Sequence, residues 1–150
     1  MEEAYIYDTV RSPRGKGKKG SLNELSAVTL SATILKELRE RNSLNTVEIE
    51  DVIWGNVTQV GEQGGCLARS AVIAANYSES TPGLSINRFC ASGLEAVNLA
   101  TNQVKGSAGN AYVAGGVEMM SRVPMGSDGA AIAVDPTLAM NSYFVPQGIS

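Results

Sequence analysis

The chain has 150 residues, of which 43% are hydrophobic and 18% are charged, and its formal net charge is −3 at pH 7. This composition suits one domain of ordinary size with a buried core, and it excludes a disordered chain. The lack of a basic excess argues against nucleic acid as a partner. No apolar run approaches the roughly 18–20 residues that span a bilayer, so we expect no membrane association either.

The chain contains two cysteines and no histidine. Two cysteines do not make a disulfide framework, and the opening MEEAYIYDTV lacks the basic and apolar regions of a secretory signal, so we expect a cytoplasmic location or an organelle. Without histidine the chain cannot by itself form a Cys-His pair or a histidine metal site, and we expect no bound metal. A general base would have to be a carboxylate, a lysine or a group on another chain.

The N-terminal region predicts a strand, a loop and a helix in turn. Residues 4–10 are rich in aromatic and β-branched side chains and predict a strand. The loop RSPRGKGKKG at 11–20 carries five Lys or Arg residues, which could contact phosphates or could be only solvated. Ser21 and Glu24 have capping-box spacing, and the apolar period that follows predicts a helix over 22–41.

Strands and helices alternate along the middle of the chain. Strands are predicted at 51–57, 81–89 and 111–118, with helices at 66–77 and 91–107. This alternation predicts an α/β fold with a mixed, mostly parallel sheet flanked by helices. Beyond Met119 no period is sustained, and three prolines and three glycines predict a long irregular excursion.

Cys90 lies where the strand 81–89 gives way to the helix 91–107. The unpaired N–H groups and the macrodipole of a first helical turn stabilise a thiolate, and they can also bind an oxyanion during acyl transfer. The three residues after Cys90 are small enough for an acyl group to approach the sulfur, and Arg88 could add positive charge. The alternative is a buried cysteine that only fills space.

Packing is the favoured interpretation for several other conspicuous residues. Cys66 also opens a predicted helix, but we expect it to be a packing residue. Trp54 and the pair Met119–Met120 are expected in the core.

Four motifs together resemble the thiolase family, the acyl-CoA C-acyltransferases. NRFCASGLEAV at 87–97 resembles the acylating-cysteine signature, and RSPRG at 11–15 resembles the family's R-[ST]-P-x-G opening. VIWGNVTQVGEQGGCLAR at 52–69 is similar to the second strand and the turn after it, and VAGGVEMMSRVPM at 113–125 to the GG-x-E-x-M-S segment. The motifs stand in the family's order, and they cover essentially the whole chain as an N-terminal portion only.

The resemblance implies a layered fold. Thiolases have two similar α/β halves in an α-β-α-β-α arrangement, with a loop domain inserted in the first half that helps to bind CoA. Residues 1–118 would be most of the N-terminal half, and 119–150 would begin the loop domain, which is incomplete here. Cys90 would be the nucleophile at the start of a buried central helix.

The resemblance also implies a reaction and its partners. Cys90 would attack the keto carbon of a 3-ketoacyl-CoA, acetyl-CoA would leave, and a second CoA would take the acyl group from sulfur. In the reverse direction two acetyl-CoA molecules would condense. Coenzyme A is thus a substrate, bound by residues that the sequence does not identify, and no cofactor is bound permanently. Homodimers or tetramers are implied, and the motifs favour the broad 3-ketoacyl group over the short-chain biosynthetic one.

The family's C-terminal half carries a GHP histidine and a second cysteine, and neither carries over to this chain. Only Cys90 with its backbone N–H does, so we expect these 150 residues alone to be inactive without a histidine-bearing half on the same or a separate chain. The alternative is a non-catalytic dimerisation or assembly module derived from a thiolase half. A ketoacyl synthase is a third alternative, and GGVEMMS argues against it.

Overall fold

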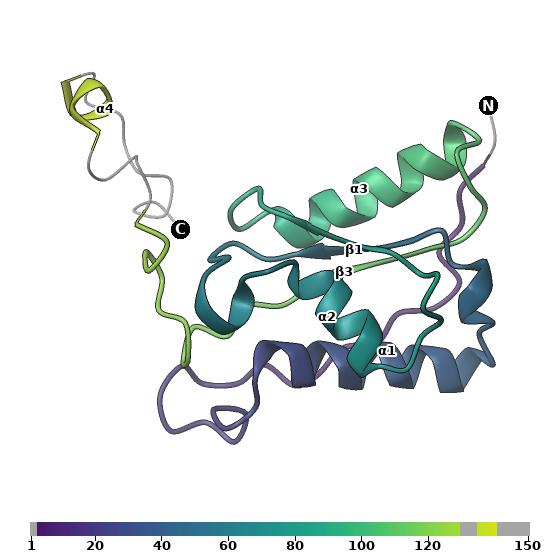
Figure 1. Cartoon of the computed structure of the whole chain (residues 1–150), viewed down its shortest axis with the longest axis horizontal. Coiled ribbons are helices and arrows are strands. Elements are labelled where there is room, and N and C mark those ends of the chain that lie inside the picture. Colours follow the sequence, from purple (N-terminus) through teal and green to yellow (C-terminus); the bar gives the residue numbers. More distant parts are fainter. Residues whose placement is uncertain (1–2, 130–134, 141–150) are drawn as a thin grey trace.

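The computed structural model describes residues 3–129 and 135–140, which form a parallel sheet with helices on both faces (Figure 1). Its elements are α1 (Ala27–Asn42), η1 (Thr46–Glu48), β1 (Asp51–Gly55), η2 (Gly61–Gln63), α2 (Leu67–Ala74), β2 (Gly83–Ile86), α3 (Ser92–Lys105), β3 (Tyr112–Gly116) and α4 (Pro136–Met140). The α/β class is confirmed, and each strand and helix predicted in the middle of the chain is present with shorter bounds.

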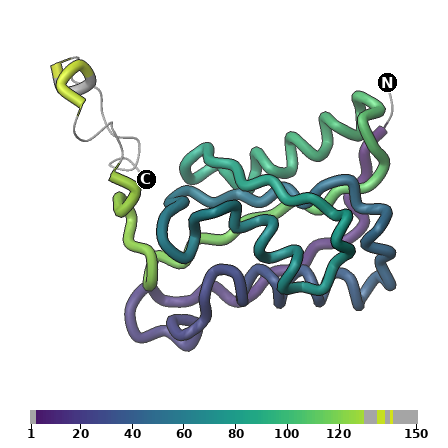
Figure 2. The backbone as a smooth tube through the Cα atoms, in the orientation of Figure 1, coloured from purple at the N-terminus to yellow at the C-terminus, as the bar shows by residue number. Residues whose placement is uncertain are grey.

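The three strands stand in the order β2-β1-β3, and both pairings are parallel. Central β1 aligns Val52 with Gly83 on one side and with Val113 on the other. All of β1 except Asp51 is buried, as expected for a strand covered on both faces. Figures 1 and 2 show α3 on one face of the sheet, with α1 and α2 on the other.

Helix α1 begins at Ala27, five residues later than predicted. The Ser26 hydroxyl accepts a hydrogen bond from the N–H of Thr29 at 3.1 Å and caps the helix. Ahead of this cap the chain forms separate turns, in which the N–H of Leu25 donates to the carbonyl of Leu22. The predicted capping box at Ser21 is therefore wrong, because a better-placed serine lies one turn further along.

The core lies mainly between α1, α2 and the sheet. Trp54 is buried there, and its indole Nε1–H donates to the Ser31 hydroxyl at 3.0 Å. The predicted core positions of Trp54 and Met119 are confirmed, whereas Met120 is 53% exposed. Met119 closes a turn after β3, because its carbonyl accepts from the N–H groups of Arg122 and Val123, and Met120 lies in that turn.

Residues 4–10 do not form the predicted strand. Their backbone makes no ladder of hydrogen bonds with another part of the described chain, and β-rich composition alone cannot replace a paired neighbour. The segment instead runs beside α1, where Asp8 pairs with Arg41 at 3.3 Å and accepts from the Asn42 amide at 2.8 Å. The hydrogen bonds from the Asn42 amide and the Thr9 N–H, together with the nearby Arg41 guanidinium, lower the pKa of Asp8.

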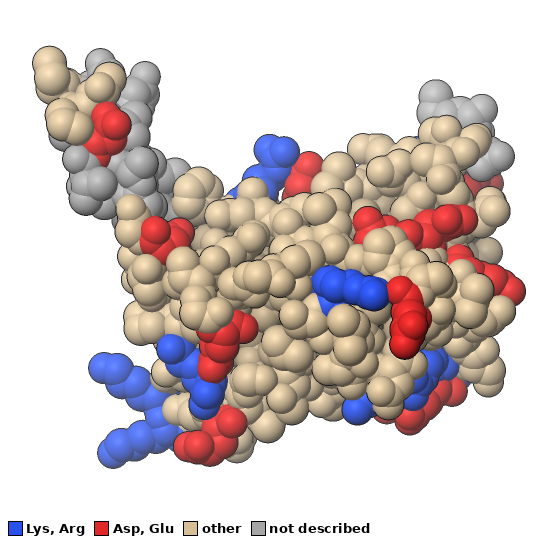
Figure 3. All heavy atoms as spheres, viewed as in Figure 1, with Lys and Arg blue, Asp and Glu red and all other residues tan. Residues whose placement is uncertain are grey.

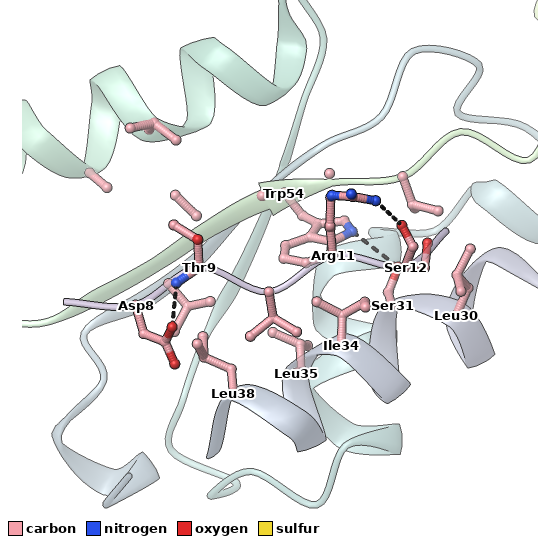
Figure 4. Close-up of a pocket in the computed structure, with 18 of the residues that line it drawn as sticks. Asp8, Thr9, Arg11, Ser12, Leu30, Ser31, Ile34, Leu35, Leu38 and Trp54 are labelled. Carbon is pink, nitrogen blue, oxygen red and sulfur yellow. Dashed lines mark hydrogen bonds between the residues drawn. The ribbon is translucent and has the colours of Figure 1, made fainter. Parts of the chain in front are cut away.

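A groove of about 1100 Å³ lies between this N-terminal segment, α1, α3 and β3, and all four contribute to its lining. Figure 4 shows Leu30, Ile34 and Leu38 of α1 pointing into it. Residues 4–17, residues 110–121 and mostly apolar side chains of α1 and α3 line the groove together.

In the two stretches that the structure describes, no helix has both the length and the apolar character to cross a bilayer. Part of the irregular excursion expected beyond Met119, residues 130–134 and 141–150, lies outside these stretches. The predicted division of the chain at residue 118 stays a prediction.

Candidate active site at the carboxyl edge of the sheet

Three loops meet at one edge of the sheet, because the carboxyl ends of parallel strands lie together. They are residues 56–58 after β1, 87–91 after β2 and 117–119 after β3. The connection from β2 through α3 to β3 passes over β1 to the opposite side of the sheet. Ligands of open α/β sheets bind at such carboxyl edges, where the strand order reverses.

Cys90 lies at this edge and is exposed to solvent. It comes two residues before Ser92, the first residue of α3, and directly precedes the helix cap Ala91. The structure thus places the sulfur at the start of a helix, where the sequence predicts it. The alternative of a buried, space-filling Cys90 does not fit this exposure.

The turn that carries Cys90 is held by side chains. Phe89 has a positive φ of 47°, an uncommon conformation for a residue other than glycine. Its N–H donates to Asn87 Oδ1 at 2.8 Å. The Ser92 hydroxyl, which is buried, accepts from the Arg88 N–H at 2.8 Å and donates to the Phe89 carbonyl at 2.6 Å. These contacts orient the backbone on both sides of the thiol.

Free N–H donors and open space surround the first turn of α3. The N–H groups of Cys90, Gly93 and Leu94 find no acceptor within the described part of the chain. A Cβ atom built on Gly93 would meet nothing within 4 Å. The turn therefore offers unpaired donors next to room for a substrate, which is the chemistry that an oxyanion requires.

A close contact with the central strand sets the position of α3. A Cβ atom on Gly55 would lie 2.6 Å from the backbone carbon of Ser92. Only glycine at the end of β1 allows the first turn of α3 to rest directly on the strand. The sequence indicates this only indirectly, since a glycine inside a strand is typical of a close backbone approach.

Arg88 does not add free positive charge at Cys90. Its guanidinium pairs with Glu95 at 3.2 Å, one turn into α3, and the arginine side chain is 65% exposed. The predicted contribution of Arg88 is therefore balanced by a neighbouring carboxylate.

Sequence reasoning missed a polar cluster next to this site, formed by Asn56, Gln63 and Glu118. Gln63 and Asn56 are buried, and Gln63 is fully so. Glu118 accepts from the Gln63 amide at 2.8 Å and from the Val57 N–H at 2.7 Å. The GG-x-E-x-M-S motif singles out Glu118, but no local pattern reveals that Gln63 and Asn56 turn inward to meet it.

Cys66 is exposed, so its predicted packing role is wrong. It precedes α2 with a positive φ of 60°, after two glycines, and this left-handed backbone turns the side chain outward. The thiol donates to the Gly83 carbonyl on β2 at 3.2 Å. The Cys66 thiol therefore contacts the first residue of β2, whereas Cys90 follows the carboxyl end of the same strand.

An ion pair ties the segment after β3 to η2. Arg122 donates to both carboxylate oxygens of Glu62, at 2.6 and 2.9 Å. These hydrogen bonds lower the pKa of Glu62 and raise the pKa of Arg122. The pair braces the chain just beyond the polar cluster.

The basic loop 11–20 contributes residues 11–17 to the groove beside α1. None of its Lys or Arg residues forms an ion pair within the part of the chain that the structure describes. Figure 3 shows long basic side chains projecting from the end of the molecule where this loop lies. Among the described residues, no three His, Cys, Asp or Glu side chains gather closely enough to hold a metal ion.

Comparison with known proteins identifies the family. Residues 4–147 match the family model of the thiolase N-terminal domain. The chain is 40% identical over 142 residues to a 3-ketoacyl-CoA thiolase of Colwellia psychrerythraea, covering 94% of this chain and 36% of that protein. It is 40% identical over 126 residues to a 3-ketoacyl-CoA thiolase of Pseudoalteromonas atlantica, covering 83% and 33% respectively.

A solved structure agrees with these relatives. The Bacillus anthracis acetyl-CoA acetyltransferase superposes with a TM-score of 0.64 at 33% identity, over 68% of this chain and 26% of that one. Fold and carboxyl-edge site together define an α/β domain of the thiolase type. The chain belongs to the thiolase family, as its N-terminal domain. It spans about a third of the length of the curated relatives it matches.

Proposed function

We propose that this chain is the acyl-accepting part of a thiolase, and that Cys90 is its nucleophile. The observation that carries the proposal is an exposed thiol at the start of α3, beside unpaired N–H groups and open space. Relatives named 3-ketoacyl-CoA thiolase and acetyl-CoA acetyltransferase support acyl-CoA and CoA as the substrates, and hence a place in fatty acid metabolism.

The reaction would proceed in two displacements. The Cys90 thiolate attacks the keto carbon of a 3-ketoacyl-CoA, and the bond from that carbon to the α-carbon breaks. The departing enolate takes a proton and leaves as acetyl-CoA, while the acyl group stays on sulfur as a thioester. A second CoA gives its thiol proton to a base, attacks the thioester and restores the thiolate. Free N–H groups of the turn, such as that of Cys90, stabilise the tetrahedral oxyanions.

The base that activates Cys90 would come from outside these 150 residues. The chain contains no histidine, and general acid–base assistance typically contributes ~10²–10⁴-fold. We therefore propose that a histidine-bearing C-terminal half, on the same or a separate chain, completes the site. The outer side of α3, where Leu94 is 65% exposed, is a surface that such a half would cover. Residues 119–150 would begin the loop domain, and the complete enzyme would be a homodimer or tetramer.

Intact mass spectrometry tests the role of Cys90 directly. The chain, mixed with a histidine-bearing thiolase C-terminal half and treated with acetyl-CoA, should gain one acetyl group. Substitution Cys90→Ser should abolish the adduct, whereas Cys66→Ser should keep it, which makes the second exposed cysteine a matched control. Acylation that persists in the Cys90→Ser variant, or no adduct under any condition, contradicts the proposal.

The absence of histidine also favours a second candidate, a non-catalytic assembly module. In that case the chain would retain a surface for its partner without taking part in the chemistry. Activity of the assembled protein would then be the same with Cys90→Ser as with the original chain, whereas a nucleophilic Cys90 requires that activity to collapse.

A further inference from the structure

We propose that Glu118 is a positioning residue for Cys90. Its carboxylate fixes the loop after β1, and that loop holds the turn carrying the thiol through Asn87. The inference rests on the proposed function of Cys90 as nucleophile and adds a residue to its machinery. Glu118 acts on the turn through the loop after β1 and the Asn87 side chain, without contact to the sulfur.

The first step is the contact between Glu118 and the loop after β1. One carboxylate oxygen accepts from the Val57 N–H at 2.7 Å, and the other from the Thr58 N–H at 3.3 Å and the Gln63 amide at 2.8 Å. No Lys or Arg forms an ion pair with Glu118 among the residues that the structure describes. The carboxylate is therefore committed to orienting N–H groups, and charge-assisted bonds of this kind are strong.

Gln63 fixes Glu118 in one orientation. The Gln63 amide nitrogen also donates to the Thr58 carbonyl at 2.9 Å, and its oxygen accepts from the Met119 N–H at 2.8 Å. Because Gln63 is fully buried, neither end of its amide has water as a substitute partner. The two ends of the Gln63 amide thus join the loop after β1 to the loop after β3.

Asn87 carries the constraint to the turn with the thiol. Its amide nitrogen donates to the Val57 carbonyl at 3.2 Å, and its oxygen accepts from the Phe89 N–H at 2.8 Å. Phe89 is the residue with positive φ directly before Cys90. A continuous path therefore runs from Glu118 through Val57 and Asn87 to the backbone beside the sulfur.

Charge and position have opposite effects on the thiol, which makes the role testable. Removal of a nearby negative charge favours a thiolate and would by itself speed its alkylation. Loss of the orientation of the turn moves the sulfur away from the helix N-terminus and slows alkylation. Glu118→Gln removes the charge, whereas Glu118→Asp keeps the charge and shortens the reach by one methylene.

The experiment measures the rate at which iodoacetamide alkylates Cys90 at neutral pH in the intact protein. A Cys66→Ser background leaves Cys90 as the only cysteine among these 150 residues, and peptide mapping assigns the adduct. We expect both Glu118→Gln and Glu118→Asp to slow alkylation by roughly two- to tenfold. Glu40→Gln, which removes a carboxylate from an exposed ion pair on α1, should leave the rate unchanged.

A double variant tests the route through Asn87. Asn87→Ala, at an exposed position, should slow alkylation to a similar extent. Glu118→Gln combined with Asn87→Ala should then be no slower than the slower single variant, because both break one path. Effects that multiply in the double variant overturn the route, and Asn87→Ala still tests it if a Glu118 variant does not fold.

The remaining outcomes separate this inference from the proposed function. Faster alkylation of Glu118→Gln with an unchanged Glu118→Asp assigns Glu118 a charge effect and overturns positioning. Unchanged rates in both variants, with Cys90 still acylated by acetyl-CoA in the original protein, overturn the inference and keep the proposed function. Absence of the acetyl adduct from the original chain in the presence of a histidine-bearing C-terminal half defeats the proposed function itself.

Discussion

At the scale of single residues, Ser92 connects the fold to the chemistry. It is buried at the start of α3 and closes the turn through its hydroxyl, with the Arg88 N–H as donor to it and the Phe89 carbonyl as acceptor from it. The backbone adds two bonds to the same turn, from the Ala91 N–H to the Arg88 carbonyl at 3.1 Å and from the Ser92 N–H to the Phe89 carbonyl at 2.9 Å. Among the described residues, the Ser92 hydroxyl is the acceptor that these backbone bonds do not supply for the Arg88 N–H.

We expect Ser92→Ala to lower the free energy of unfolding by about 1–3 kcal/mol, because it leaves a backbone donor without its acceptor. Urea denaturation measures this change. Ser21→Ala, at an exposed serine whose hydroxyl makes no hydrogen bond to the part of the chain that the structure describes, is the matched control and should change stability little. Equal effects at the two positions would show that the Ser92 hydroxyl does not hold the turn.

The sequence predicts the position of Cys90, but it does not predict the buried polar residues beside it. The position of Cys90 follows from a strand, a run of small residues and a helix, all of which are local patterns. Gln63 and Asn56 could not be found in this way, since their burial depends on loops that are far apart in the chain. Cys66 was wrongly assigned to packing because its outward direction depends on a positive φ after two glycines.

At the scale of elements, the contact between β1 and α3 decides where the thiol stands. Gly55 lies against the backbone of Ser92, so the strand and the helix approach more closely than side chains would allow. Parallel strands with helices on both faces could be predicted from the alternation of elements. The close approach of α3 to β1 depends on how the helix crosses the strand in three dimensions, and only the structure shows it.

Gly55→Ala should displace the first turn of α3 and destabilise the protein by about 1–3 kcal/mol, as overpacking of a filled contact does. Thermal unfolding measures the loss, and alkylation of Cys90 reports the displaced turn. Gly17→Ala, where a Cβ atom would meet nothing within 4 Å, should be close to neutral. A stable Gly55→Ala variant with normal Cys90 reactivity would contradict the importance of this contact.

A second element-scale contact joins the end of α2 to α1. The Tyr77 hydroxyl donates to the Leu35 carbonyl at 2.9 Å in a buried position, and burial raises the pKa of Tyr77 to about 12. The folded state thus favours the neutral phenol. This contribution is fully present below the unfolded pKa of about 10, and it is lost as pH rises from there through about 12.

Tyr77→Phe should lower the free energy of unfolding by about 0.5–1.5 kcal/mol at neutral pH, through loss of the hydrogen bond. The same variant should lose less stability than the original protein between pH 10 and 12, since it has no phenol to ionise. Urea titrations across this range test both statements. Tyr7→Phe, at a tyrosine that is 92% exposed, should follow the original protein.

At the scale of the whole molecule, the N-terminal segment shows where sequence reasoning ends. Residues 4–10 have the composition of a strand, yet a strand exists only with a neighbour to accept and donate its hydrogen bonds. The segment faces the groove beside α1 and β3 without such pairing. Composition thus indicates that residues 4–10 favour extended backbone. It does not indicate whether another strand lies beside them to form the hydrogen bonds of a sheet.

The Glu62–Arg122 pair connects regions of the molecule that are 60 residues apart. Because Arg122 lowers the pKa of Glu62, the pair contributes stability above the unfolded pKa of that carboxyl, and the contribution is lost as pH falls through the folded pKa. Carboxyl NMR should show Glu62 titrating below an ordinary glutamate. Arg122→Gln should move that titration back up, and an unmoved midpoint would mean that the pair does not form in solution.

The single tryptophan has a practical consequence for every variant above. Trp54 is buried between the sheet and α1, at the inner wall of the groove, so its fluorescence reports on the packing of that layer. Separation of α1 from the sheet would admit water and shift the emission to longer wavelength. Trp54 therefore reports on the side of the sheet opposite α3. A variant that changes Cys90 reactivity without changing the emission wavelength of Trp54 is disturbed on the α3 side of the sheet.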